Sequence, residues 1–164
     1  MARLKNMEIQ NKELHRVVPT AIICKDGKYL ILQRGRHKKV FPGRWTVPGG
    51  GLTVDDYINT QKTTADAWYY AVRECLKREV KEETGLDVDK LNYLLDLAFI
   101  RPDGIPVVTL SYYGDYVSGD VQLNEESVDY RWVTAEEANQ YDLIEGIQDE
   151  IKMVDKIKKN GQNG

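Results

Sequence analysis

The chain has 164 residues, 41% of them apolar, which suits one globular domain. A formal net charge of −3 argues against a nucleic-acid polymer as partner. The longest apolar runs are far shorter than the ~20 residues that cross a bilayer, and residues 1–10 lack a signal-peptide pattern. The two cysteines follow no disulfide or zinc pattern. We therefore expect a cytoplasmic protein with no membrane partner.

In chain order, apolar periodicity and turn residues predict a series of strands and helices. Six strands are expected from β-branched or alternating apolar residues, at 17–24, 29–33, 45–48, 90–100, 107–117 and 128–133. A helix is expected from Thr63 or Thr64 to Thr84, a short capped helix from Thr134, and a closing helix over 145–159. This order predicts an α/β (α+β) fold, a mixed β-sheet sandwiched between helices.

The expected domain organisation is simple. A single domain covers residues 16–159 and is preceded by an N-terminal extension over 1–15, either frayed or forming an edge strand. Residues 160–164 are polar and are expected to form a disordered tail.

The helix that ends at Thr84 carries acidic residues where its apolar stripe should continue. Val72, Leu76, Glu79 and Glu83 share one face at helical spacing. A helix with purely solvated charges would keep its acids away from that stripe. Carboxylates gathered in a recess are unfavourable unless a cation lies between them. We therefore expect Glu79 and Glu83 to take part in chemistry.

The same helix end resembles the Nudix box, together with Pro48-Gly49-Gly50. The family pattern is Gly, five residues, Glu, seven residues, then Arg-Glu-apolar-x-Glu-Glu-x-Gly-apolar. Residues 78–86, Arg-Glu-Val-Lys-Glu-Glu-Thr-Gly-Leu, match its second half at every defined position. Supporting features cover roughly residues 17–143. The resemblance implies the Nudix fold.

The first half of the box departs from the family pattern. Gly50 and Arg78 are 28 positions apart, twice the family spacing, so an insertion of about fourteen residues lies between Leu52 and Tyr70. Tyr70 stands where the family has a Glu that supports the Arg and the glycine loop. Two acids are candidates to replace it. Asp56 keeps the spacing after Gly50, and Glu74 keeps (i, i+4) proximity to Arg78.

The resemblance implies a metal-dependent hydrolase that cleaves a pyrophosphate bond in a nucleoside diphosphate-X substrate by water attack on phosphorus, with Mg²⁺ or Mn²⁺. Arg78 would orient Glu79 or a neighbouring carboxylate. Glu79 is the first choice for activating the water, and Glu126 is a second candidate base or loop ligand. The implied metal ligands are Glu79, Glu82, Glu83 and the Gly50 carbonyl.

The expected partner is a small phosphorylated molecule, a nucleotide. Phosphate contacts are expected from Arg34, Arg36 and Arg44, because the guanidinium fork fits phosphate. Gly49 and Gly50 let the backbone approach a ligand closely. Pairing with a second copy of the chain is left open. Among the adjacent aromatics at 68–70, at least one is expected to contact the inserted segment or a partner subunit.

Two other functions fit the same fold. A Nudix-fold module that binds or senses a nucleotide without cleaving it would have a degenerate box, whereas the acidic half here is intact. An isopentenyl-diphosphate-isomerase-like enzyme would need a catalytic cysteine in the Pro48–Gly50 region, which has none.

Overall fold

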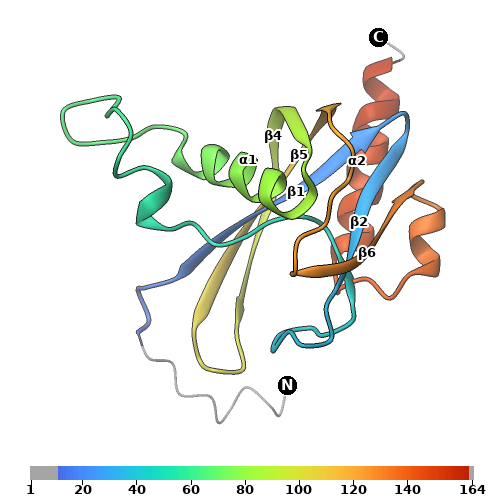
Figure 1. Cartoon of the computed structure of the whole chain (residues 1–164), viewed down its shortest axis with the longest axis horizontal. Coiled ribbons are helices and arrows are strands. Elements are labelled where there is room, and N and C mark those ends of the chain that lie inside the picture. Colours follow the sequence, from blue (N-terminus) through green and yellow to red (C-terminus); the bar gives the residue numbers. More distant parts are fainter. Residues whose placement is uncertain (1–10, 163–164) are drawn as a thin grey trace.

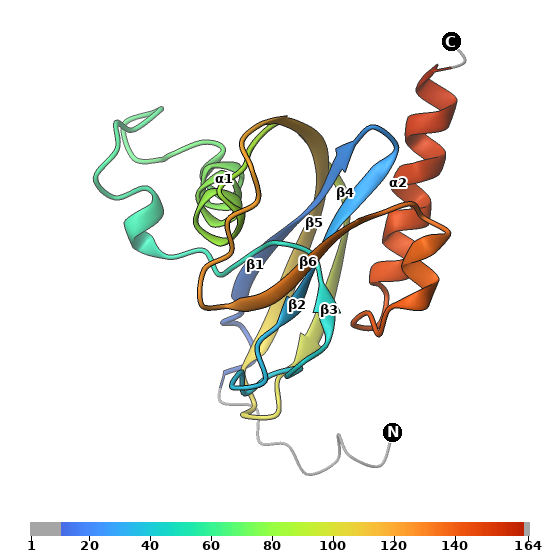
Figure 2. The ribbon, with the colours of Figure 1, turned by 45° about the vertical axis from the view of Figure 1, so that its right-hand side comes forward.

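The computed structural model describes residues 11–162. Its centre is a mixed sheet that lies between helix α1 and helix α2 (Figures 1 and 2), which confirms the predicted fold class. The strands are β1 (Arg16–Lys25), β2 (Lys28–Arg34), β3 (Trp45–Thr46), β4 (Asp87–Ile100), β5 (Pro106–Ser118) and β6 (Ser127–Val133). The helices are α1 (Ala71–Thr84) and α2 (Ile147–Gln162), with short 3-10 helices η2 (Val54–Asp56) and η3 (Glu137–Gln140).

The sheet has the order β3-β2-β1-β5-β4, with β6 on the other side of β2. β1 and β5 are parallel, and the remaining pairs are antiparallel. Alternate side chains of a strand point to opposite faces, so Ile22 and Ile31 pack toward α2 while Ile23 and Leu30 pack with α1 residues. Because both faces are covered, the central strands are almost continuously apolar.

Helix α1 begins at Ala71, later than Thr63 or Thr64. The two threonines cap a turn of the insertion instead. The Thr64 hydroxyl accepts from the Ala67 amide at 3.1 Å, and the Thr63 hydroxyl accepts from the Tyr69 amide at 3.1 Å. Tyr70, with φ of 62°, then turns the chain into the helix. The two threonines therefore act as caps, as the sequence indicated, but they cap a local turn and not helix α1.

The inserted segment forms its own small structure beside α1 (Figure 1). Tyr57 and Trp68 pack with ring centroids 5.2 Å apart, and the Trp68 indole donates to the Thr60 carbonyl at 3.0 Å. This confirms that one of the three adjacent aromatics contacts the insertion. Tyr69 and Tyr70 are exposed.

The C-terminal end of the chain differs from expectation. Helix α2 continues to Gln162, so residues 160–162 are helical rather than a disordered tail, and residues 163–164 lie outside the described residues. Residues 11–15 are exposed and form no strand, and residues 1–10 are outside the described range. Among the described residues, no helix is long and apolar enough to cross a membrane.

Candidate active site

The glycine segment lies along β1 and faces α1. Gly50 donates its amide to the Pro19 carbonyl at 3.2 Å, and Ala21 donates to the Pro48 carbonyl at 2.8 Å. A Cβ on Gly49 would lie 2.4 Å from the Pro19 carbonyl oxygen, and one on Gly50 would lie 2.2 Å from the carboxyl carbon of Glu79. Both glycines are therefore required, Gly49 against the strand and Gly50 against the helix.

Helix α1 directs Glu79 and Glu83 toward this glycine segment. Leu76 and Val80 on the same side are fully buried and hold the helix against the sheet. The Glu79 side chain is only 16% exposed. The acids therefore continue the buried face of the helix, as the sequence pattern predicted.

Burial changes the proton affinity of both acids. Burial, with the charges of Glu79 and Glu126 added to it, raises the pKa of Glu83 to about 8, although the Gly49 backbone and Arg34 act in the opposite sense. Burial also raises the pKa of Glu79, even though Arg78 stabilises its charged form. Burial therefore disfavours the charged form of both acids, and a bound cation would offset that cost.

Arg78 connects three carboxylates. Its Nε donates to Asp56 at 2.5 Å, and its two terminal nitrogens lie 2.9 Å from Glu79 Oε1 and 2.9 Å from Glu82 Oε2. The Asp56 side chain is 2% exposed. Burial would raise the pKa of Asp56, but hydrogen bonds from Arg78 and Thr53 outweigh burial and leave the pKa below its usual value.

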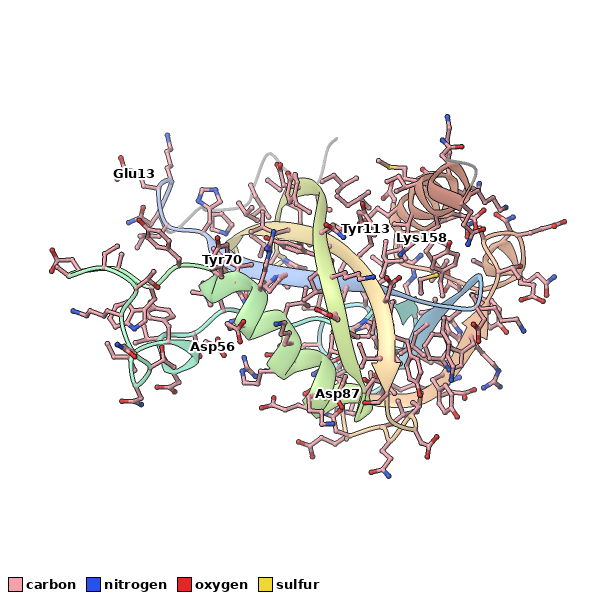
Figure 3. The ribbon with its side chains drawn as sticks, turned by 90° about the horizontal axis from the view of Figure 1, so that it is seen from above. Glu13, Asp56, Tyr70, Asp87, Tyr113 and Lys158 are labelled. Carbon is pink, nitrogen blue, oxygen red and sulfur yellow. The ribbon has the colours of Figure 1, made fainter. Side chains whose placement is uncertain are left out.

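Asp56, and not Glu74, therefore occupies the place of the missing box Glu beside Arg78. Glu74 is largely exposed, and its carboxylate lies 3.6 Å from Lys77. Figure 3 labels Asp56 and Tyr70, which both lie on the α1 side of the inserted loop. The insertion therefore follows Asp56 and covers residues 57–70, a narrower segment than the sequence comparison allowed.

The end of β2 and the loop before β6 also contribute residues near these acids. Arg34 follows a register shift in the β2–β6 pairing, and Gly35 donates its amide to the Glu126 carbonyl at 3.1 Å. Burial lowers the pKa of Arg34, while Glu126 and Glu83 act in the opposite sense. Arg34 therefore shares the site with both acids.

Lys38 forms an ion pair with Glu126 and was missed in the sequence. The only signal for it was the basic loop as a whole. Arg44 from that loop instead binds Asp142 at 3.2 Å and the Leu143 carbonyl at 2.6 Å, and Arg36 is exposed and makes no ion pair within residues 11–162. Of the three arginines expected to bind phosphate, the structure brings only Arg34 to the acids.

The donors in the recess fit a hard divalent cation, since they are carboxylate and carbonyl oxygens. Within residues 11–162, however, no three His, Cys, Asp or Glu side chains are already grouped to hold a metal ion. Several of the nearby acids form ion pairs with basic side chains. Arg78 binds Glu79 and Glu82, and Lys38 binds Glu126. Basic side chains thus neutralise acids that a cation would otherwise share.

Comparison with known proteins identifies the family. A NUDIX domain family model matches residues 14–155. The chain is 30% identical to nucleoside triphosphatase NudI of Klebsiella pneumoniae (strain 342) over 139 residues, 78% of this chain and 88% of the relative.

Solved structures share the fold. The crystal structure of a MutT protein from Methanosarcina mazei Go1 has a TM-score of 0.67 at 23% identity, covering 92% of this chain and 99% of that one. A C. elegans Ap4A hydrolase binary complex has a TM-score of 0.62 at 19% identity, covering 88% and 98%. With its family match, its fold and its acidic helix end in agreement, the chain belongs to the Nudix family and is a Nudix pyrophosphohydrolase.

Proposed function

We propose that this enzyme hydrolyses a pyrophosphate bond in a nucleoside triphosphate or related nucleotide with the help of Mg²⁺ or Mn²⁺. The observation that carries the proposal is that Glu79 and Glu83 lie close to Gly49–Gly50 and Arg34. The triphosphate is favoured over other substrates because the NudI relative is named a nucleoside triphosphatase. The Ap4A hydrolase with the same fold is named for a different nucleotide, so the fold alone does not select the substrate.

The proposed metal ligands are Glu79, Glu82, Glu83 and the Gly50 carbonyl. A bound divalent cation would neutralise charge on the phosphate oxygens and help position the attacking water. Arg78 keeps the carboxylates of Glu79 and Glu82 within reach of one another, and the buried Asp56 holds the guanidinium in place. Asp56 is thus a positioning residue.

The proposed general base is Glu79. Arg78 binds its Oε1, while the carboxyl group as a whole lies against Gly50. The water oxygen would form a bond to phosphorus, the bridging P–O bond would break, and the water proton would pass to the carboxylate. Glu126 remains the second candidate, and it forms an ion pair with Lys38.

Phosphate binding is proposed for Arg34, Lys38 and the Gly49–Gly50 backbone, which surround the acids. Arg36 is retained as a contact from the outer loop. Arg44 is proposed to act indirectly, because it holds the loop at Asp142 and Leu143.

A cytoplasmic location remains a prediction from the composition. The same holds for the absence of a nucleic-acid or membrane partner.

A non-catalytic sensor is the competing function. Tyr70 in place of the box Glu is the feature of the sequence that would favour it. Asp56 now supplies the carboxylate to Arg78, so the box is complete in space although it is divided in sequence. The structure therefore weakens the main argument for the sensor.

The proposal is tested by a substrate panel. Nucleoside triphosphates, dinucleoside polyphosphates, ADP-ribose and nucleotide sugars would be incubated with Mg²⁺ or Mn²⁺, and released phosphate or pyrophosphate measured. The Glu82→Gln variant should lose nearly all metal-dependent turnover while its circular dichroism spectrum is unchanged, because the substitution removes ligand charge but little volume. Binding of nucleotides without turnover of any of them would support the sensor instead.

A further inference from the structure

The longest strand of the sheet, β4, is an edge strand. It pairs with β5 on one side, and no described residue pairs with its other side. Because β4 spans Asp87–Ile100, the backbone N–H and C=O groups along that side have no strand partner among residues 11–162. Such an edge is a ready template for another strand.

The second half of β4 is also apolar and incompletely covered. It follows a register shift between Tyr93 and Leu95, after which the pairing with β5 is regular as far as Ile100. Leu97 and Phe99 are both 37% exposed. Asp96 is the one charged residue from 94 to 100. Leu95, Leu97 and Phe99 alternate along the strand and so share one face of the sheet.

The other sheet edges are protected in ways that β4 is not. β3 contains only two residues. β6 carries Asp129 and Arg131, which form an ion pair with each other. Short edge strands and charged side chains are the usual means of preventing strand addition. The second half of β4 is therefore the edge that is neither short nor carries an ion pair of its own, although Lys12 and His15 line a groove with Ala98–Ile100.

We propose that β4 pairs antiparallel with β4 of a second copy of this chain, with the two-fold axis at Leu97. The pairing would join the two sheets into one. It would place Leu95 opposite Phe99 of the second copy, Leu97 opposite its own equivalent, and Asp96 opposite Ala98. The apolar side chains of both copies would then form one cluster across the axis, and no like charges would face each other.

The choice of register follows from the strand itself. Only alternate residues of a strand direct their backbone N–H and C=O groups toward a given edge. In a two-fold antiparallel pair, a residue on the axis must therefore face its own equivalent, and the axis cannot lie between two successive residues. An axis at Asp96 would oppose two carboxylates. An axis at Leu95 would include the register shift at Tyr93, and one at Ala98 would bring Arg101 of the turn into the pairing. Leu97 alone uses the regular stretch without these costs.

The oligomeric state in solution tests the proposal. Light scattering on the full chain should give a mass near twice 18.8 kDa across a concentration series. Leu97→Arg should raise the dimer dissociation constant at least about 100-fold, because it opposes two buried cations across the axis. The matched control is Val128→Arg on β6, a more exposed apolar position, which should leave the dimer unchanged. A monomeric wild type, or a dimer that survives Leu97→Arg, would overturn the proposal.

Cross-linking tests the register. Cα atoms of directly opposed residues lie about 4.5–5.5 Å apart, within disulfide reach. Oxidised Leu97→Cys should therefore give a covalent dimer, whereas in Leu95→Cys the equivalent positions would be about 13 Å apart and should not cross-link. Wild type under the same oxidant controls for Cys24 and Cys75. A dimer that forms only after residues 1–10 are removed would mean that the full chain is monomeric. That result would contradict the proposal.

Discussion

The two helices on opposite faces of the sheet each carry an acid into the interior, but only one of them builds a site. On α1, Glu83 lies near Glu79, Glu126 and Arg34. On α2, Glu150 is buried at 8% exposure among apolar residues. Burial raises the pKa of Glu150, although the Ser111 hydroxyl acts in the opposite sense. Burial of a carboxylate is common to both helices.

The difference lies in what meets each acid. The α1 face receives the glycine segment, the end of β2 and the loop before β6, so backbone and charged groups converge there. The α2 face receives the apolar cluster around Ile22 and Ile151. A buried acid becomes a candidate for chemistry when other polar groups are brought to it, and otherwise it only reduces stability.

The largest effect is expected on kcat, which should fall when Glu83 is changed but not when Glu150 is changed. Glu83→Gln should lower metal-dependent kcat at least about 100-fold, because it removes charge from the proposed cation site. Glu150→Gln on the opposite face should leave kcat within about twofold. Steady-state hydrolysis measured at saturating Mg²⁺ checks both, with thermal unfolding as the folding control. Equal losses in the two variants would contradict the contrast between the helices.

A smaller loss is expected from the residue that supports Arg78. Asp56→Asn should lower kcat about 10–100-fold and raise the Mg²⁺ concentration needed for half-maximal rate, as is typical when a partner of a ligand is lost. Glu74→Gln is the control, because Glu74 contacts Lys77 and not Arg78. A titration of rate against Mg²⁺ distinguishes positioning from simple destabilisation. If Glu74→Gln were the more damaging change, the assignment of the divided box would be wrong.

The insertion should affect which substrate is used more than how it is cleaved. Replacing residues 57–70 with a short glycine linker keeps Asp56 and α1, so turnover of the preferred substrate should fall less than about tenfold while the ranking of the substrate panel changes. Comparing kcat/KM across the panel measures this. An unchanged ranking would mean that the Tyr57–Trp68 structure serves stability alone.

The smallest effect concerns stability on the α2 face. Because burial raises the pKa of Glu150, the unfolded state loses this proton at lower pH than the folded state, and stability falls as pH rises through that window. Glu150→Gln should therefore stabilise the protein at pH 7 by about 1 kcal/mol and have little effect near pH 4. Urea unfolding at both pH values, with exposed Glu145→Gln as control, checks the sign. A variant that is less stable at pH 7 would show that Glu150 is charged and well paired.

Much of this protein was determined by local sequence. β-branched and alternating apolar residues predicted the six strands, and the central strands were the most apolar because both faces of the sheet are covered there. The position of Glu79 and Glu83 on the buried face followed from the helical repeat alone. The capping box was also readable, since Thr134 and Glu137 exchange hydrogen bonds at 2.9 and 3.1 Å over three residues.

Only the tertiary structure decided which distant groups meet. Asp56 and Glu74 were equivalent candidates by spacing, and the fold selected Asp56, which lies 22 positions from Arg78 and is nearly inaccessible to solvent. Lys38 and Glu126, 88 positions apart, could not be paired in advance for the same reason. Helical and strand periods are properties of neighbouring residues, whereas contacts across a sheet depend on how whole elements pack. The acidic helix end could therefore be predicted from the sequence, but the distant groups that surround it could not.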